Sequence, residues 1–213
     1  MGADSMFFRS AFLTILVAMA ISSPPAAADI IGDAAVSYSA SQTVTVNGRT
    51  YHGKVFHNPG RHRVDVDING IPASFILDLA DRDGIVVLPA LASYLEFPLP
   101  PLLSEFDRRR LDHKGVGEER VAGIRATKYR LNYAATDGTR GDGFIWLSPD
   151  NILLRIEGRI LRRGHKPMVI SMNLSNIQLG PQRESLFRLN KGLHKIPEEA
   201  LKLLLNMGHQ KSR

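Results

Sequence analysis

Polar and apolar residues alternate with a period of two through much of this chain. From Val36 to Val46 the even positions are mainly apolar and the odd positions carry Ser or Thr, which is typical of a strand with one buried and one solvent-facing side. Further alternations and short apolar runs predict strands over residues 50–57, 61–68, 73–79, 85–88, 124–133, 144–147, 152–156 and 168–174. The chain is therefore predicted to be mainly β.

Short turn signals separate these segments. Asn47-Gly48, Asn69-Gly70 and Asp83-Gly84 punctuate the first half, together with Asn58-Pro59-Gly60, and Asp137-Gly138 follows later. Asn-Gly and Asp-Gly supply the positive-φ residues that tight hairpins need. Turns at such short intervals predict an antiparallel meander and argue against a βαβ nucleotide-binding fold.

Two segments interrupt the β pattern. Residues 89–120 contain Pro98, Pro100 and Pro101, which disfavour both ladder and helix, so this segment is predicted to be a long connection or short helical piece crossing the sheet. A helix is predicted over 198–207, because Pro197 precedes it and Gly208 follows it. Both segments are expected to act as lids, as long connections often do.

The N-terminus is typical of a secretory signal peptide. Arg9 precedes an apolar run over 11–21, and Ala26-Ala27-Ala28 offers a small-residue cleavage site. The run is shorter than the roughly 20 residues that a bilayer span needs, which argues against an uncleaved anchor. Because the chain has no Cys, it lacks the acylated cysteine of a lipoprotein. We therefore predict a signal peptide over 1–28, and a single exported, periplasmic domain over 29–213.

The chain is basic. It contains 27 Lys and Arg against 21 Asp and Glu, a formal net charge of +6. A basic surface suits anionic partners such as lipid headgroups, acidic proteins or nucleic acid. Export makes nucleic acid the least suitable of these, and the basic residues are dispersed with little aromatic interleaving. A lipid, an acylated protein or an envelope protein remains the expected partner, with at most peripheral membrane contact.

Two sets of candidate metal ligands can be weighed. Asp65-Val66-Asp67-Ile68-Asn69-Gly70 resembles the start of a calcium loop, but Ile76 stands where the bidentate Glu should be. His52, His57 and His62 recur at a spacing of five, which sends His52 and His57 to opposite faces of one strand. We therefore expect a strand and turn in the first case, scattered polar-face histidines in the second, and no metal.

Motifs for catalysis are absent from the sequence. There is no Gly-x-Ser-x-Gly elbow, no His-Glu-x-x-His and no Ser-x-x-Lys. Glu118-Glu119 and Glu198-Glu199 are sequence neighbours that point to different sides of their elements. The sequence predicts no enzyme, no catalytic residue and no cofactor.

Large apolar side chains on the predicted strand faces must be buried. The ordinary explanation is a filled core. With few covering elements, however, a curled sheet of this size would present an apolar groove to a lipid or acyl chain. The predicted groove residues are Tyr38, Val44, Phe56, Val66, Phe75, Tyr129, Trp146 and Met172, and the predicted rim or headgroup residues are Arg63, Arg108, Arg109 and Arg110.

Parts of the sequence resemble the LolA/LolB-type envelope proteins. The stretch Tyr51-His52-Gly53-Lys54-Val55 leads to Asn58-Pro59-Gly60-Arg61-His62-Arg63, similar to that family's strand glycine, Pro-Gly turn and strand arginine. The stretch 117–124 followed by Thr127-Lys128-Tyr129-Arg130, with Trp146, Ser148 and Asp150 beyond it, is similar to a related group of exported proteins. The chain differs from the carriers in having little room for a long helix before the first strand, and from the receptor branch in lacking its lipidated cysteine.

The resemblance implies a fold and a function. The fold is an unclosed antiparallel β half-barrel of about ten to eleven strands, here with the crossing loop and C-terminal helix as lids. The function is non-catalytic binding or carriage of a lipid, acyl chain or other amphiphile in the cell envelope. The alternative is an envelope protein-interaction or assembly subunit, whose core is filled and whose sheet edges bind another protein.

Overall fold

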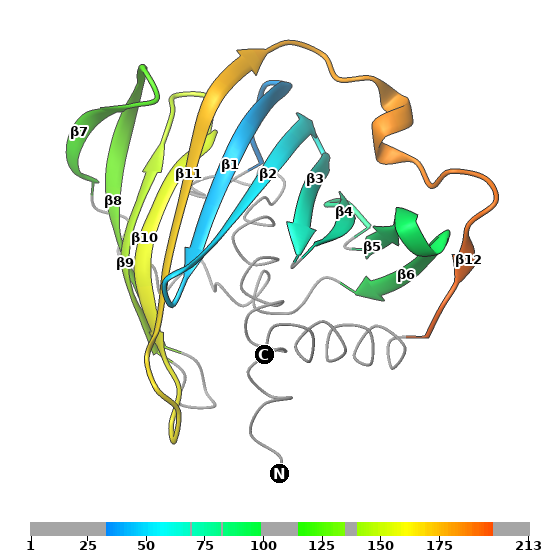
Figure 1. The fold of residues 1–213 in the computed structure, drawn as a ribbon. Helices are drawn as coiled ribbons and strands as arrows, with labels where there is room; N and C mark the ends of the chain where they lie inside the picture. The colour runs from blue at the N-terminus through cyan, green and yellow to red at the C-terminus, as the bar shows by residue number, and fades with distance from the viewer. Residues whose placement is uncertain (1–32, 69, 82, 99–114, 135–139, 198–213) are drawn as a thin grey trace.

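Twelve strands form one sheet in the computed structural model, which describes residues 33–68, 70–81, 83–98, 115–134 and 140–197 (Figure 1). In chain order the strands are β1 (Tyr38–Val46), β2 (Arg49–Asn58), β3 (Arg61–Ile68), β4 (Ile71–Asp78), β5 (Asp83–Leu88), β6 (Ser93–Pro98), β7 (Gly115–Val121), β8 (Ile124–Ala134), β9 (Arg140–Leu147), β10 (Leu153–Leu161), β11 (Met168–Leu179) and β12 (His194–Lys195). Two short 3-10 helices, η1 (Pro89–Leu91) and η3 (Glu184–Phe187), complete the described elements.

The sheet is strongly curved and does not close. Its order is β12-β6-β5-β4-β3-β2-β1-β11-β10-β9-β8-β7, and every pairing is antiparallel except that of β12 with β6. The pairing of β1 with β11 joins the two halves of the chain at the centre of the sheet. Figure 1 shows the two halves curving toward each other. The predicted half-barrel class is confirmed.

Most predicted strands are present, and three details differ. The segment predicted as a connection contains β6 and most of β7, and the tail adds the two-residue β12. Asp83-Gly84 does not form a turn but opens β5, opposite Leu77 and Asp78 of β4. The turn lies just before it, where the Asp78 carboxylate accepts the backbone N–H groups of Ala80 and Asp81 at 3.1 Å.

One face of the sheet carries the main apolar cluster and is called the inner face. Alternation explains its composition, because the even residues of β1 are buried and the odd residues lie closer to solvent. Register then aligns apolar residues from strand to strand. One row crosses six neighbouring strands and consists of Tyr129, Ile145, Ile156, Met172, Val44 and Tyr51.

Two glycines of the sheet allow neighbouring groups to approach their backbone closely. A Cβ atom on Gly143 would lie 2.2 Å from the Glu157 carbonyl oxygen and 2.6 Å from the Gly158 Cα. A Cβ on Gly84 would meet ring atoms of Phe97 at 2.3–2.7 Å, because that ring covers the glycine. Both glycines sit within strands, where such residues mark a close approach.

The opposite, outer face is covered over β3–β5 by the segment that follows β11. Phe187 of η3 packs against Ile76 and Val87 in a second, smaller apolar cluster. Arg63 fixes this segment, since its guanidinium donates to the Leu186 carbonyl at 2.8 Å, to Ser74 Oγ at 3.1 Å and to Asp65 Oδ1 at 2.7 Å. Beyond η3, β12 pairs with β6 and covers that edge of the sheet.

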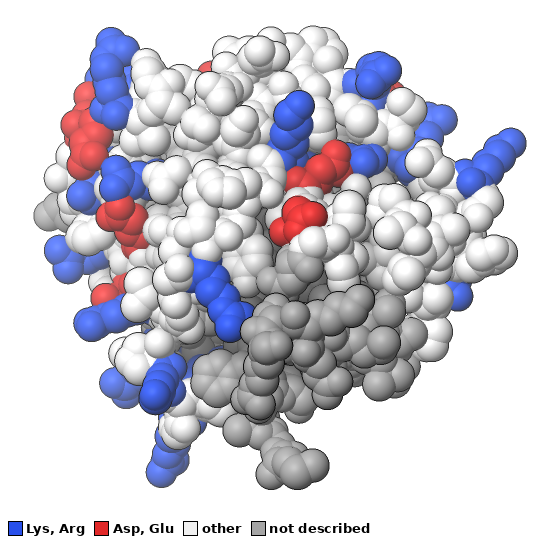
Figure 2. All heavy atoms as spheres, viewed as in Figure 1, with Lys and Arg blue, Asp and Glu red and all other residues white. Residues whose placement is uncertain are grey.

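Charged side chains are scattered over the surface seen in Figure 2. Basic groups gather around the protruding tip of the β10–β11 hairpin, at the lower left of that view. In the described part of the chain, no helix has the length and hydropathy that a bilayer crossing requires.

Candidate ligand-binding face

Six of the eight predicted groove residues share the inner face. Tyr38, Val44, Val66, Phe75 and Met172 are buried there, and Tyr129 is half-buried and packs against the same cluster. Phe56 and Trp146 differ from these six in strand parity, although Trp146 also contacts the main apolar cluster. Phe56 belongs to the outer cluster beside η3, and Trp146 points away from Ile145, its inner-face neighbour in β9. The predictions for individual residues rest on strand parity, and the register of the sheet turns these two side chains to the outer face.

Arg63 has a different place from the one predicted. It lies on the outer face opposite Phe56 and Ile76, where its three hydrogen bonds hold the η3 segment, so it does not stand at a rim of the inner face. Arg108, Arg109 and Arg110 lie outside the described residues. The same is true of residues 198–213, of the signal-peptide segment and of residues 99–114 of the predicted crossing loop.

The apolar part of the inner face is only half-buried at the end formed by the β10–β11 hairpin. Leu131, Gly143, Gly158, Ile160 and Met168 are all half-buried there, and this set is called the glycine end. Register places Leu131 beside Gly143 and Gly143 beside Gly158, with the Ile160–Met168 pair following toward the hairpin turn. The two glycines at the centre of the set carry no side chains, and Leu131, Ile160 and Met168 lie around them in register.

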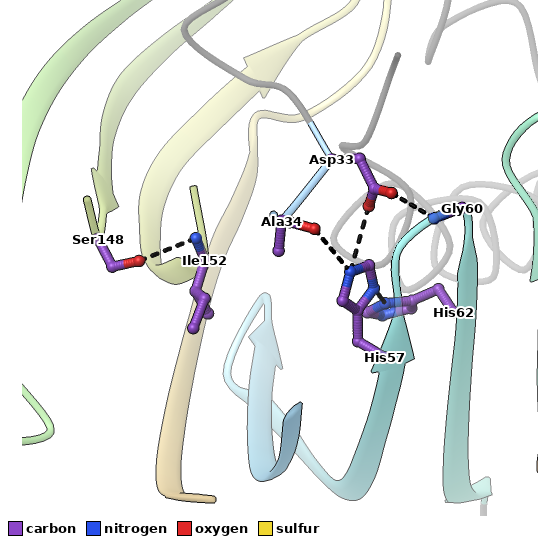
Figure 3. Close-up of polar contacts among 7 residues, drawn as sticks. All are labelled: Asp33, Ala34, His57, Gly60, His62, Ser148 and Ile152. Atoms are coloured by element: carbon purple, nitrogen blue, oxygen red, sulfur yellow. Dashed lines mark hydrogen bonds and ion pairs between the residues drawn. The ribbon is translucent and has the colours of Figure 1, made fainter. Parts of the chain in front are cut away.

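A buried polar cluster occupies the opposite end of the same face. His57 of β2 and His62 of β3 are paired in register, and their Nδ1 atoms are 3.4 Å apart (Figure 3). His57 Nε2 lies 3.1 Å from the Ala34 carbonyl oxygen and 3.4 Å from Asp33 Oδ1. Asp33 Oδ2 accepts the backbone N–H of Gly60 in the β2–β3 turn. The cluster thereby ties the segment before β1 to that turn.

The hydrogen bonds define the tautomers of the two neutral imidazoles. Because His57 Nε2 faces a carbonyl oxygen, it carries the proton and donates to Ala34. Its Nδ1 is then an acceptor, so His62 Nδ1–H donates to it. Protonation of His57 would place two N–H groups against each other. The hydrogen bonds of the pair therefore favour the neutral form of both imidazoles.

Burial reinforces that neutral state. His57 is 1% exposed and His62 is 6% exposed. Desolvation, together with the neighbouring His57, lowers the pKa of His62 to about 3. Desolvation also lowers the pKa of His57, against the opposing effects of Asp33 and the Ala34 carbonyl. Burial raises the pKa of Tyr38, whose ring centroid lies 5.1 Å from that of His57.

The expectation of scattered histidines was wrong for this pair. His52 does lie on the outer face, where it contacts Thr43 Oγ1 at 3.3 Å. His57 and His62 meet because Pro59-Gly60 forms a two-residue turn, with Asn58 opposite Arg61. That turn was recognised in the sequence, and counting back from it pairs residue 57 with 62. In the described part of the chain, no three His, Cys, Asp or Glu side chains are arranged to hold a metal ion.

At the hairpin connecting β9 and β10, Ser148 organises the chain reversal. Its Oγ accepts the backbone N–H of Ile152 at 3.0 Å (Figure 3) and that of Asp150 at 3.2 Å. The Asp150 carbonyl in turn accepts the Ala35 N–H at 2.9 Å. Residues 33–35 therefore connect this hairpin to the β2–β3 turn, which makes Ser148 a structural residue.

Trp146 forms an outer-face feature of its own. The Lys128 ammonium and the Arg155 guanidinium each lie 4.7 Å from its ring centroid. The indole is only 1% exposed because these two aliphatic stems and their charged ends cover it. The cations also contact Glu119 and Glu157. This arrangement stabilises the β8–β10 region and leaves no open ligand site on the indole.

Comparison with known proteins gives similarity in structure but not in sequence. No protein-family model matches the chain, and no curated protein matches it. An uncharacterised conserved protein from Thermus thermophilus has a TM-score of 0.51 at 14% identity, over 76% of this chain and 90% of that one. MucB, in the MucA/MucB complex of Pseudomonas aeruginosa, has a TM-score of 0.47 at 15% identity, over 76% of this chain and 58% of that one.

A solved LolA superfamily protein is also among the similar structures. The LolA superfamily protein NE2245 from Nitrosomonas europaea is 11% identical over 83% of this chain and 96% of that one, with a TM-score of 0.40. At such identities the likeness concerns the fold alone.

Proposed function

We propose that the protein is an exported, periplasmic binding or carrier protein for an amphiphilic ligand with an acyl or similar apolar chain, and that it performs no chemistry on this ligand. The observation that carries the proposal is the continuous apolar inner face. Its row from Tyr129 to Tyr51 crosses six strands, which spans about 24 Å at the usual strand spacing. Most residues of this row are buried, so the ligand is proposed to extend the apolar face from the end where it is only half-buried.

The glycine end is the proposed point of contact with the ligand. Inner-face residues farther along, such as Ile145 and Met172, are almost fully buried, whereas the glycine end remains half-open. An alkyl chain that lies over Gly143 and Gly158 would contact Leu131 and Met168 on its sides. Each methylene removed from water there would contribute about 0.8 kcal/mol, so a dozen carbons would give ample affinity.

Native mass spectrometry of protein purified from the periplasm without detergent tests this proposal. A carrier should show a stoichiometric adduct that disappears after solvent extraction, and the extract should identify the cargo class. The delipidated protein should regain thermal stability when the ligand is restored, since binding to the folded state alone stabilises it. A bare polypeptide mass that phospholipid and fatty acid leave unchanged would exclude the proposal.

A pair of substitutions locates the binding site. Leu131→Glu places a carboxylate at the half-buried glycine end and should reduce the adduct strongly, because a charge beside an alkyl chain must be desolvated. Leu91→Glu introduces the same change on the exposed helix η1 and should leave the adduct intact. Equal adduct levels in both variants would place the ligand elsewhere.

A protein-interaction role is the second candidate, and one observation favours it. Inner-face side chains in β3 and β4, such as Val64 and Phe75, are fully buried, as expected of a filled core. Among the described strands, β7 forms the edge of the sheet beside β8 and is exposed along most of its length. If no adduct is found, capture of an added strand by this edge is the mechanism to test next.

A further inference from the structure

The β10–β11 hairpin combines a basic tip with an apolar base. Its turn, residues 162–167, contains Arg162, Arg163 and Lys166 and no acidic residue. Arg163, His165 and Lys166 are exposed. The Ile160–Met168 pair of the glycine end lies directly at the base of this turn. The tip and the glycine end therefore occupy the same end of the molecule.

Neighbouring elements add positive charge to this end. Arg140 at the start of β9 pairs with Leu161. The β1–β2 turn is bonded to the start of β11, since Asn47 exchanges two hydrogen bonds with Val169, and this places the exposed Arg49 nearby. Asp142 is the acidic side chain of the described residues in this region, and it is paired with Arg159 at 2.8 Å. Residues 135–139, which contain Asp137, lie outside the description.

The shape and polarity of the hairpin suit a membrane surface. Figure 1 shows it reaching farther than the other described strands at that end, and Figure 2 shows basic side chains around it. Val169 beside the turn is 57% exposed, and Pro167 is exposed as well. An exposed aliphatic residue among cations fits the headgroup layer of an anionic bilayer, where both kinds of group find partners.

We propose that the β10–β11 hairpin docks the protein on an anionic phospholipid surface, so that the glycine end faces the bilayer where cargo enters or leaves. This inference rests on the proposed carrier function to explain why the protein would dock on a membrane. The attraction between the basic hairpin and an anionic bilayer does not depend on that function. Each basic side chain close to an anionic bilayer should raise the affinity about fivefold, and the attraction should weaken as salt increases. An acidic protein partner would have to place carboxylates opposite the individual basic side chains, whereas an anionic bilayer presents negative charge over its whole surface.

Vesicle co-sedimentation tests the docking surface. Wild-type protein should bind phosphatidylcholine vesicles that contain phosphatidylglycerol, but not vesicles of phosphatidylcholine alone, and high salt should release it. The double variant Arg163→Gln, Lys166→Gln should bind about 25-fold more weakly, from two contributions of about fivefold each. The double variant Arg188→Gln, Lys191→Gln has the same net charge, changes exposed residues beyond η3 and should bind like the wild type.

The outcomes separate docking from carriage. Loss of vesicle binding by the hairpin variant, with its native-mass adduct retained, supports the docking surface and leaves carriage intact. Vesicle binding by a wild-type protein that carries no adduct supports docking and contradicts the carrier function. Equal binding by both double variants, or failure of the wild type to prefer the anionic vesicles, would overturn the docking surface whatever the adduct shows.

Discussion

At the residue scale, the His57–His62 pair makes stability depend on pH. The pKa of His62 is about 3 in the folded protein against an ordinary 6.5, so the unfolded chain binds more protons below 6.5. Stability contributed by the neutral pair is therefore complete above that pH and decreases as the pH falls toward 3, by up to about 1.4 kcal/mol per pH unit for one histidine. The lowered pKa of His57 acts in the same direction.

Replacement of His62 should reduce this dependence. In His62→Asn, the amide nitrogen can still donate to His57 Nδ1 but cannot gain a proton. Urea unfolding at pH 7 and pH 5 should show a loss for the wild type that exceeds the loss for the variant by about 2 kcal/mol. His52→Asn, on the outer face, controls for the removal of one histidine and should behave like the wild type. Parallel losses in all three proteins would contradict the neutral-pair assignment.

The strand glycines give a second prediction at this scale. Gly143→Ala should destabilise the protein by about 3 kcal/mol or more, because the new Cβ meets the backbone of β10, which cannot move without breaking the ladder. Gly84→Ala should cost about 1–2 kcal/mol, since its obstacle is the Phe97 ring, a side chain that can rotate. Denaturant midpoints compare them directly, and an equal cost would show that the close approach at Gly143 is not rigid.

At the element scale, Arg63 helps to hold the η3 segment on the outer face, together with Asn58, which exchanges two hydrogen bonds with Gln182. Arg63→Met removes the donors to Leu186 and Ser74, and should lower stability by about 1–3 kcal/mol while exposing residues 180–193 to protease. Arg61→Met removes an ion pair with Glu184 that is largely exposed, so it should cost less than about 1 kcal/mol. Mass analysis of the first proteolytic fragments would show whether cleavage falls in this segment.

The strands that alternation predicted and those it missed differ for a physical reason. β1 and β3 bury one face, so their alternating sequences identified them. β7 is exposed at six of its seven positions, so no burial selects an alternating sequence there. β6 lies next to prolines and joins the sheet near its edge, where proline is tolerated.

The candidate site was predictable only in part, for related reasons. Parity along the long strands placed Val44 and Met172 on one face, as expected. Trp146 is buried on the side of Lys128 and Arg155 because these residues provide a cover of side-chain stems that no periodicity reveals. The glycine end depends on Gly143 lying beside Gly158, which requires the register of β9 against β10. Register depends on the whole sheet and not on either strand alone.

At the scale of the whole molecule, the apolar cluster joins both halves of the sheet. It contains Val64 and Phe75 from one half and Ile145 and Met172 from the other, although the halves share only the β1–β11 pairing within the sheet. A continuous core predicts one cooperative unfolding transition for the described fold. Two independently stable halves would instead give two transitions.

Trp146 makes this prediction measurable, because it is the single tryptophan of the chain and reports on the β8–β10 half. Val64→Ala creates a cavity in β3 of the other half, at a fully buried position, and should cost about 2 kcal/mol. The denaturant midpoint from Trp146 fluorescence should fall as far as the midpoint from far-UV circular dichroism. Thr45→Ala on the outer side of β1 should move both midpoints little. A fluorescence midpoint that stays in place while the circular dichroism shifts would show that the halves unfold separately, and that the inner face is not one surface that a single ligand could stabilise.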